Sequence, residues 1–180
     1  MSNLRLEMNR LLLICLLIIN CLVSLGQDNY PTPTRMDGVL FYIQHNRGKN
    51  TYIYSLNYKS DKTINKEEPI QVYRQLFDNG GVIRPLTIIQ KNFAYGIDAK
   101  LLKNNSYEAS IVSLPEQKLF LHFPSKGDPY VSTTVAGTSF ILKRIFIRQK
   151  DGTSGLSTKV DYILFYGFKD GKPLMKKLVL

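Results

Sequence analysis

The connections between strand-like segments constrain this chain more than any other feature. From Ser106 onward, apolar and aromatic runs alternate with short groups of turn residues such as Lys169-Asp170-Gly171-Lys172. Parallel neighbours would need a crossover of about a dozen residues or more, so successive strands are expected to be antiparallel. The predicted strands are 39–44, 51–58, 70–77, 107–114, 118–123, 130–136, 139–149, 159–168 and 173–179.

One segment between two of these strands has helical spacing. Leu86, Ile89 and Phe93 recur at intervals of three and four residues. Pro85 precedes them, where a first-turn proline is tolerated, and Gly96 follows, where a helix would stop. The sequence therefore predicts an all-β, mainly antiparallel domain of about nine strands, with one short helix after the third. Because closure removes exposed strand edges, an up-and-down, lipocalin-like β-barrel is favoured, with a β-sandwich as the alternative.

Residues 1–26 have the order of a secretory signal peptide. Arg5 and Arg10 precede a nearly continuous apolar run over residues 11–25. That run is shorter than the roughly 20 apolar residues that a membrane-spanning helix needs. We therefore expect cleavage before Gln27 and export to the periplasm or out of the cell, with an uncleaved anchor as the alternative.

The predicted mature chain consists of a linker and a single domain. Residues 27–37, which include two prolines, are predicted to be the linker, and residues 38–180 the β-domain. Both cysteines, Cys15 and Cys21, lie within the predicted signal peptide, so the domain is expected to fold without a disulfide. Lipidation of Cys21 is a less favoured alternative, because the residue before it is not small.

The chain has a formal net charge of +10, which favours anionic neighbours. In an exported protein these would be phospholipid head groups on a membrane surface, lipopolysaccharide or acidic glycans rather than nucleic acid. Scattered lysines that keep the domain soluble are the simpler explanation, because the sequence contains no compact basic cluster. The sequence leaves the oligomeric state open.

No motif for catalysis or for a cofactor stands out. Phosphate loops, dinucleotide fingerprints and calcium loops are missing from the sequence. The two histidines, His45 and His122, have no partner at metal-ligand spacing. Glu108 and Asp161 lie within predicted strands and leave a hydrolase of an acidic envelope polymer as a third hypothesis. We therefore predict no catalytic residue, no metal site and no cofactor.

Amide and phenol side chains are concentrated in the first half of the predicted domain. Aromatic walls with a few hydrogen-bonding groups are typical of small-ligand sites. The alternative is that these tyrosines cover sheet faces and the amides cap turns. The leading hypothesis is a non-enzymatic binding domain for a small, partly apolar or anionic ligand; the second is an interaction module that binds a protein or a glycan. The candidate ligand-binding residues are Gln44, Asn50, Tyr54, Tyr73, Gln90, Lys91 and Tyr95.

Four segments of the chain resemble a known group of sequences. They are Phe41-Tyr-Ile-Gln44, Asn50-Thr-Tyr-Ile-Tyr54, Pro69-Ile-Gln-Val-Tyr73 and Pro85-Leu-Thr-Ile-Ile-Gln-Lys-Asn-Phe-Ala-Tyr-Gly96. Together they are similar to an uncharacterised family of exported bacterial proteins known only as a domain of unknown function. The resemblance covers about residues 38–180, and it implies export and a single domain. It implies no activity, substrate or cofactor.

Overall fold

The computed structural model describes residues 30–33, 37–103 and 105–179. The chain divides into two compact units, Met1–Tyr30 and Pro31–Leu180, and the described strands all belong to the second unit. The predicted signal peptide, residues 1–26, lies outside the described residues, as do 27–29 and 34–36 of the predicted linker. Within the described ranges, no helix is both long enough and apolar enough to cross a membrane.

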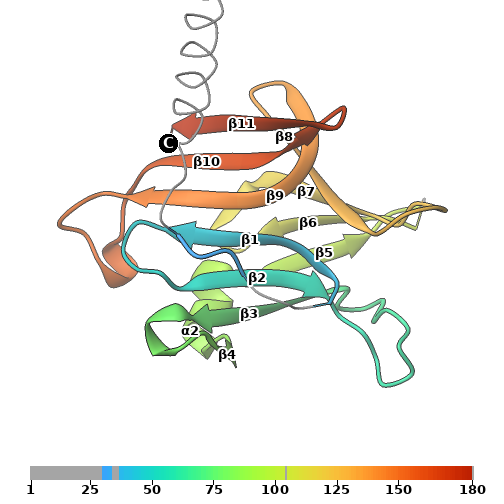
Figure 1. Ribbon diagram of the computed structural model, residues 1–180, viewed down its shortest axis with the longest axis horizontal. Coiled ribbons are helices and arrows are strands. Elements are labelled where there is room, and N and C mark those ends of the chain that lie inside the picture. The colour runs from blue at the N-terminus through green and yellow to red at the C-terminus, as the bar shows by residue number, and fades with distance from the viewer. Residues whose placement is uncertain (1–29, 34–36, 104, 180) are drawn as a thin grey trace, which may run out of the picture. The chain divides into compact units, whose positions relative to one another are not determined.

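The described strands form one sheet that curls into a half-barrel (Figure 1). The predicted fold, mainly antiparallel β with one short helix, is confirmed. The sheet runs in the order β4-β3-β2-β1-β9-β8-β7-β6-β5. Outside this order, β10 also pairs with β9, and β11 pairs with β10. The strands are β1 (Val39–His45), β2 (Thr51–Leu56), β3 (Ile70–Leu76), β4 (Val82–Pro85), β5 (Ile97–Leu101), β6 (Tyr107–Ile111), β7 (Leu114–His122), β8 (Tyr130–Val135), β9 (Thr138–Gln149), β10 (Val160–Lys169) and β11 (Lys172–Val179).

One pair of strands departs from the strictly alternating course that the short connections predict. β1 and β9 are parallel, with Tyr42–His45 aligned with Arg144–Ile147. A short connection fixes the relative direction only of strands that follow each other in sequence. Most of the domain separates β1 from β9, so no local feature of the sequence determines how they pair.

Two strands that the sequence analysis did not predict complete the sheet. β4 is exposed at all four positions and ends in Pro85, so it shows no alternation of buried and exposed residues. β5 follows directly after the helical segment, where no strand was predicted. In addition, a turn at Val112 and Ser113 divides the predicted strand 107–114 between β6 and β7.

The hydrophobic core lies on the inner face of the curved sheet. Tyr52, Tyr54 and Leu56 point to this face from β2, as the two-residue alternation predicts. Tyr54 is fully buried, and its ring stacks on that of Phe41 with 4.3 Å between centroids. The opposite face of β2 is also buried, since Ile53 has no exposed surface. Strands at the middle of the half-barrel are therefore covered on both sides.

The predicted helix is present as a short segment after β4. α2 (Ile88–Gln90) continues without a break into a single π-helical turn, η2 (Lys91–Tyr95); we call Ile88–Tyr95 the helical segment. It begins at Thr87, whose hydroxyl accepts a hydrogen bond from the backbone N–H of Gln90 at 3.2 Å. In return, the side-chain oxygen of Gln90 accepts one from the backbone N–H of Thr87 at 3.1 Å. This reciprocal capping box sets the start, so Pro85 ends β4 rather than opening the helix.

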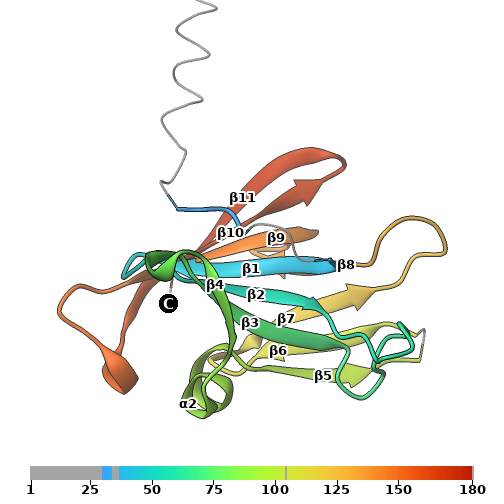
Figure 2. The same ribbon diagram turned by 60° about the horizontal axis from the view of Figure 1, so that its bottom comes forward.

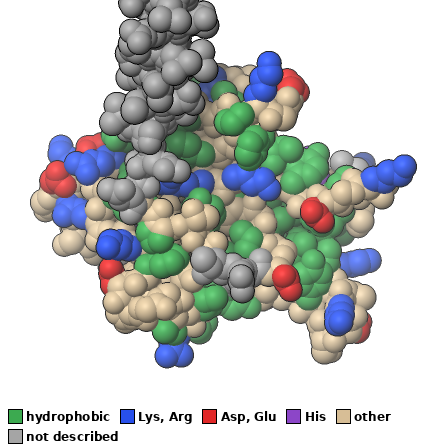
Figure 3. Space-filling model, viewed as in Figure 1, with side chains coloured by type: hydrophobic (Ala, Val, Ile, Leu, Met, Phe, Trp, Pro, Cys, Tyr) green, Lys and Arg blue, Asp and Glu red, His purple; other side chains and the backbone are tan. Residues whose placement is uncertain are grey.

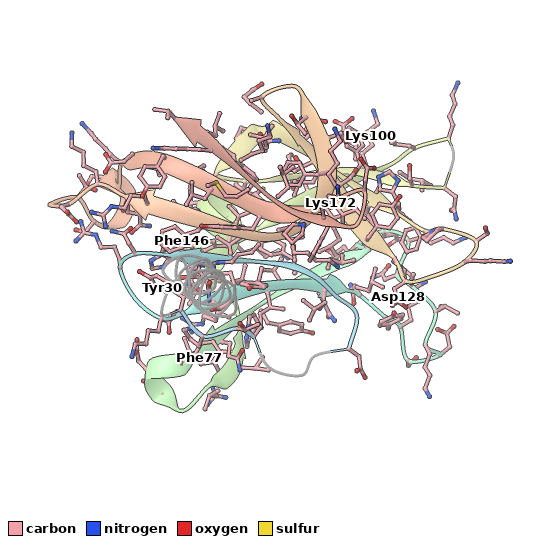
Figure 4. All side chains as sticks on the ribbon, turned by 45° about the horizontal axis from the view of Figure 1, so that its top comes forward. Tyr30, Phe77, Lys100, Asp128, Phe146 and Lys172 are labelled. Carbon is pink, nitrogen blue, oxygen red and sulfur yellow. The ribbon has the colours of Figure 1, made fainter. Side chains whose placement is uncertain are left out.

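The helical segment lies at one end of the curved sheet. Figure 2 shows α2 below β3 and close to the start of β5. Figure 4 places Phe77, which follows β3 in the short 3-10 turn η1 (Phe77–Asn79), and Asp128, between β7 and β8, at opposite ends of the sheet. The helical segment is at the end of the sheet where β3 finishes (Figure 1). A second 3-10 turn, η3 (Gly155–Ser157), precedes β10.

Candidate functional site

The helical segment is anchored to both limbs of the half-barrel through its last carbonyl groups. The Tyr54 hydroxyl on β2 donates to the Tyr95 carbonyl at 2.7 Å, and the Ser113 hydroxyl between β6 and β7 donates to the Ala94 carbonyl at 2.6 Å. The carbonyls at the end of a helix have no partner within the helix. Here donors from two distant parts of the sheet supply those partners, and they hold the end of the segment in place.

A tyrosine pair joins the helical segment to β2. The rings of Tyr52 and Tyr95 are stacked with 3.4 Å between centroids. Burial raises the pKa of Tyr52, although hydrogen bonds with Tyr95 and Gln90 and the charge of Arg74 partly lower it. Burial also raises the pKa of Tyr95, and the neighbouring Tyr52 raises it further. Both phenols therefore stay protonated at neutral pH, and the stacked pair carries no charge.

A cavity of about 650 Å³ lies between this helical segment and the inner face of the sheet. Its volume is within the range of small-molecule sites, and such sites combine a mainly apolar lining with a few polar groups. The apolar lining comes from Ile43, Ile145, Ile147, Val160 and Ile163 on the sheet, Ile111 and Leu114 beside the turn, and Ile89, Phe93, Ala94 and Tyr95 on the helical segment. The polar side chains are Gln90, Ser113, Gln149 and Thr158.

Three of these four polar side chains already have partners in the protein. Ser113 donates to the helical segment, Gln90 takes part in the capping box, and the Thr158 hydroxyl donates to the Gly155 carbonyl at 2.8 Å. Gln149 differs, because no hydrogen bond joins its side-chain amide to another described residue. Its backbone is held by Asn46, whose amide oxygen accepts from Gln149 N at 2.7 Å. The backbone of Gln149 is therefore held in place, while its side-chain amide faces the cavity without a hydrogen-bond partner among the described residues.

Large apolar side chains at the rim of the cavity are open to solvent. Ile89 is 65% exposed and Phe93 is 64% exposed. Burying such side chains against another apolar group is favourable by about 25 cal/mol per Å². A ligand that bound in the cavity and covered these side chains would therefore gain binding free energy from their burial.

One protein family matches this chain over residues 41–177, and its description is a domain of unknown function, DUF4833. The chain belongs to the DUF4833 family. The match includes every residue that lines the cavity and confirms the resemblance to a domain of unknown function. Comparisons with curated proteins and with solved structures found no match.

Two of the predicted ligand-binding residues line the cavity of the DUF4833 domain, and a third supports it. Gln90 and Tyr95 contribute directly to the lining. Tyr54 is buried behind Tyr95 and holds its carbonyl. Burial raises the pKa of Tyr54 well above the usual value, so this hydroxyl remains a donor.

The other four predicted residues lie elsewhere in the domain. Gln44 points to the outer face, where its amide donates to the Pro31 carbonyl at 2.7 Å and to the Thr51 hydroxyl at 2.9 Å. Asn50, just before β2, has a buried side-chain oxygen without a hydrogen-bond partner among the described residues. Tyr73 and Lys91 line a separate hollow of about 510 Å³ between β3 and β5. These residues are not brought together with Gln90 and Tyr95 in one site.

The side chains considered for catalysis do not gather at the cavity either. Glu108 lies 3.7 Å from Lys118 Nζ in an exposed ion pair, and Asp161 is exposed on β10. Burial lowers the pKa of both His45 and His122, and His122 Nε2 shares a hydrogen bond with the Ser132 hydroxyl at 2.8 Å. Within the described ranges, no three His, Cys, Asp or Glu side chains lie close enough to hold a metal ion.

Sequence reasoning missed the part of the lining that comes from the second half of the chain. Ile145, Ile147 and Gln149 follow one another at two-residue spacing along β9, so their common face could be predicted. Gln149 is the polar residue that ends this apolar face, and that position was the available signal for a role of its side chain in a binding site. Their position opposite the helical segment depends on the parallel pairing of β1 with β9, which has no local signal.

Proposed function

We propose that the DUF4833 domain binds a small, partly apolar ligand in the inner cavity without catalysing a reaction. The observation that carries this proposal is the cavity itself, which is mainly aliphatic and is also lined by Gln149, whose side-chain amide has no hydrogen-bond partner among the described residues. Its cover is a helical segment whose last two carbonyl groups are held by Tyr54 and Ser113 and whose rim is apolar. Such a site can desolvate an apolar group and orient it through one hydrogen bond.

The proposal places the domain in the cell envelope or outside the cell. The charged-then-apolar order of residues 1–26 supports export. The net charge of +10 supports anionic neighbours such as membrane head groups or an anionic ligand. On the face shown in Figure 3, the lysine and arginine side chains are spread between hydrophobic patches and do not form one continuous basic surface.

A second candidate function is an interaction module that binds a protein. The observation that favours it is the apolar surface of the helical segment, where Ile88 is 79% exposed beside Ile89 and Phe93. A contiguous apolar surface of this kind is also typical of protein contacts. In that case the exposed side chains would be buried by a partner, and the cavity behind them would stay vacant.

Native mass spectrometry of the protein purified from its own host separates the two functions. The ligand proposal predicts a non-covalent adduct of small mass that is removed by organic solvent. An Ile147→Trp substitution, which fills the cavity, is expected to abolish the adduct, whereas Leu164→Trp on the outer face of β10 is expected to retain it. A spectrum of ligand-free protein together with co-purification of a protein partner would support the interaction module instead.

A further inference from the structure

Two arginines lie next to each other on the inner face of the sheet, beside the tyrosine pair. Arg74 on β3 is directly opposite Arg84 on β4, and on its other side it is directly opposite Tyr52 on β2. Side chains directly opposite on antiparallel strands are close neighbours, and like charges in such positions repel each other. The fold therefore places two positively charged side chains at neighbouring positions, with Arg84 exposed to solvent.

Neither arginine is neutralised within the described part of the chain. The ion pairs present there are formed by Arg47, Lys118 and Arg148. Arg74 Nε is buried and has no hydrogen-bond partner among the described residues. A buried donor without an acceptor is destabilising, and more so when the group is charged. An oxyanion placed between the two guanidinium groups would remove both the repulsion and the missing hydrogen bond.

The two arginines end a row of side chains that begins in the cavity. Ile145, Ile43 and Tyr52 are successive neighbours across β9, β1 and β2, and Arg74 and Arg84 continue the row on β3 and β4. Neighbouring strands are about 4.8 Å apart, so the backbone of Arg74 lies roughly 10 Å from that of Ile43. Ile43 and Ile145 line the cavity. The row thus changes from aliphatic through aromatic to cationic over the length of a small amphiphile.

We infer that Arg74 and Arg84 bind the anionic head group of the ligand whose apolar part occupies the inner cavity. This inference rests on the proposed function and narrows the ligand to an amphiphile that ends in a carboxylate or a phosphate. Arginine suits this role because its planar guanidinium donates two parallel hydrogen bonds to such groups. Tyr52 lies between Ile43 and Arg74 in the row, and its ring stacks on that of Tyr95, which lines the cavity.

Titration with matched ligands tests the inference. Dodecanoate, dodecanol and inorganic phosphate are each added to the full-length protein and to the Arg74→Gln/Arg84→Gln variant, and binding is measured by calorimetry and by the Arg Nε–H NMR signals. Arg148→Gln is the control, because Arg148 is paired with Asp151 at 3.2 Å.

We expect dodecanoate to bind at least tenfold more tightly than dodecanol. The double variant should lose this preference without a change in dodecanol affinity, and the control should keep it.

The outcomes separate the inference from the proposed function. Equal affinity for the two dodecyl ligands, or a preference for dodecanoate that survives in the double variant, would overturn the arginine site while the cavity proposal stands. If neither dodecyl ligand binds but phosphate shifts the Arg74 signal, the arginines bind a free oxyanion and the cavity proposal is wrong. If nothing binds and no signal shifts, both are wrong.

Discussion

The hydroxyl of Tyr54 donates a 2.7 Å hydrogen bond to the carbonyl of Tyr95. Tyr54 is fully buried on the inner face of β2, and Tyr95 is the last residue of the helical segment. This bond satisfies a carbonyl that the helix itself cannot satisfy. It makes the position of the helical segment, and therefore the shape of the cavity, depend on a core residue of the sheet.

Replacement of Tyr54 by phenylalanine is expected to destabilise the domain. The change removes one buried donor and leaves the Tyr95 carbonyl without its partner, which should lower the free energy of unfolding by about 1–3 kcal/mol. Urea denaturation followed by circular dichroism measures this loss. Tyr58→Phe is the control, because Tyr58 is 46% exposed and should tolerate the same change. Equal stability of the two variants would contradict the proposed anchoring.

Replacement of Gly96 by alanine is expected to displace the helical segment. A Cβ at this position would overlap the Lys91 carbonyl oxygen and lie 2.9 Å from the carbonyl carbon, so the backbone must move. We expect a loss of about 1–3 kcal/mol in the free energy of unfolding, measured as above. At Gly48 a Cβ would meet nothing within 4 Å, so Gly48→Ala should be tolerated. A Gly96→Ala variant as stable as Gly48→Ala would mean that the backbone contact is absent in solution.

Stability is expected to fall as the pH drops below about 6.5. Burial lowers the pKa of His45 from its usual 6.5 in the folded state, so the unfolded chain binds a proton that the folded chain does not. The free energy of unfolding therefore decreases with falling pH between the unfolded and the folded pKa.

His45→Gln should flatten this part of the stability profile. His122, whose pKa is lowered in the same direction, provides a separate comparison through His122→Gln. Urea denaturation at a series of pH values measures both effects. A profile of His45→Gln with the same slope as the unaltered protein would refute the assignment.

The exposed rim of the cavity is expected to matter for binding and not for folding. Phe93→Ser removes a ring that is 64% exposed, so the free energy of unfolding should change by no more than about 0.5 kcal/mol. A ligand that covers roughly 50 Å² of this ring would lose about five- to tenfold in affinity. Phe168→Ser on β10, where the ring is 40% exposed and lines another hollow, should leave binding intact. Unchanged dodecanol affinity in Phe93→Ser would contradict a role for the rim.

Much of the fold was predictable because local pattern controls it. The alternation that places Tyr52 and Tyr54 on one face, and the spacing of Ile89 and Phe93, depend only on neighbours in sequence. The start of the helical segment was misplaced, because Thr87 forms a capping box that outweighs the first-turn preference of Pro85. The parallel pairing of β1 with β9 could not be predicted, since no short connection links these strands.

The candidate site was predictable only in part for the same reason. Gln90 and Tyr95 belong to a local segment with clear spacing, and both line the cavity. Gln44 has a suitable side chain but lies on the outer face, where Pro31 and Thr51 already bind it. Gln149 comes from the end of β9 and reaches the cavity only through long-range pairing. Side-chain type was thus readable from the sequence, whereas side-chain direction required the assembled sheet.

NMR of the isoleucine methyl groups during titration with dodecanoate tests the central proposal most directly. We predict saturable shifts of the methyl signals of Ile43, Ile145, Ile147 and Ile163, which line the cavity. Ile53, which is fully buried on the outer face of β2, should not shift. Signals that remain unchanged at saturating ligand, or shifts of Ile53 as large as those of the cavity group, would contradict a ligand site inside the half-barrel.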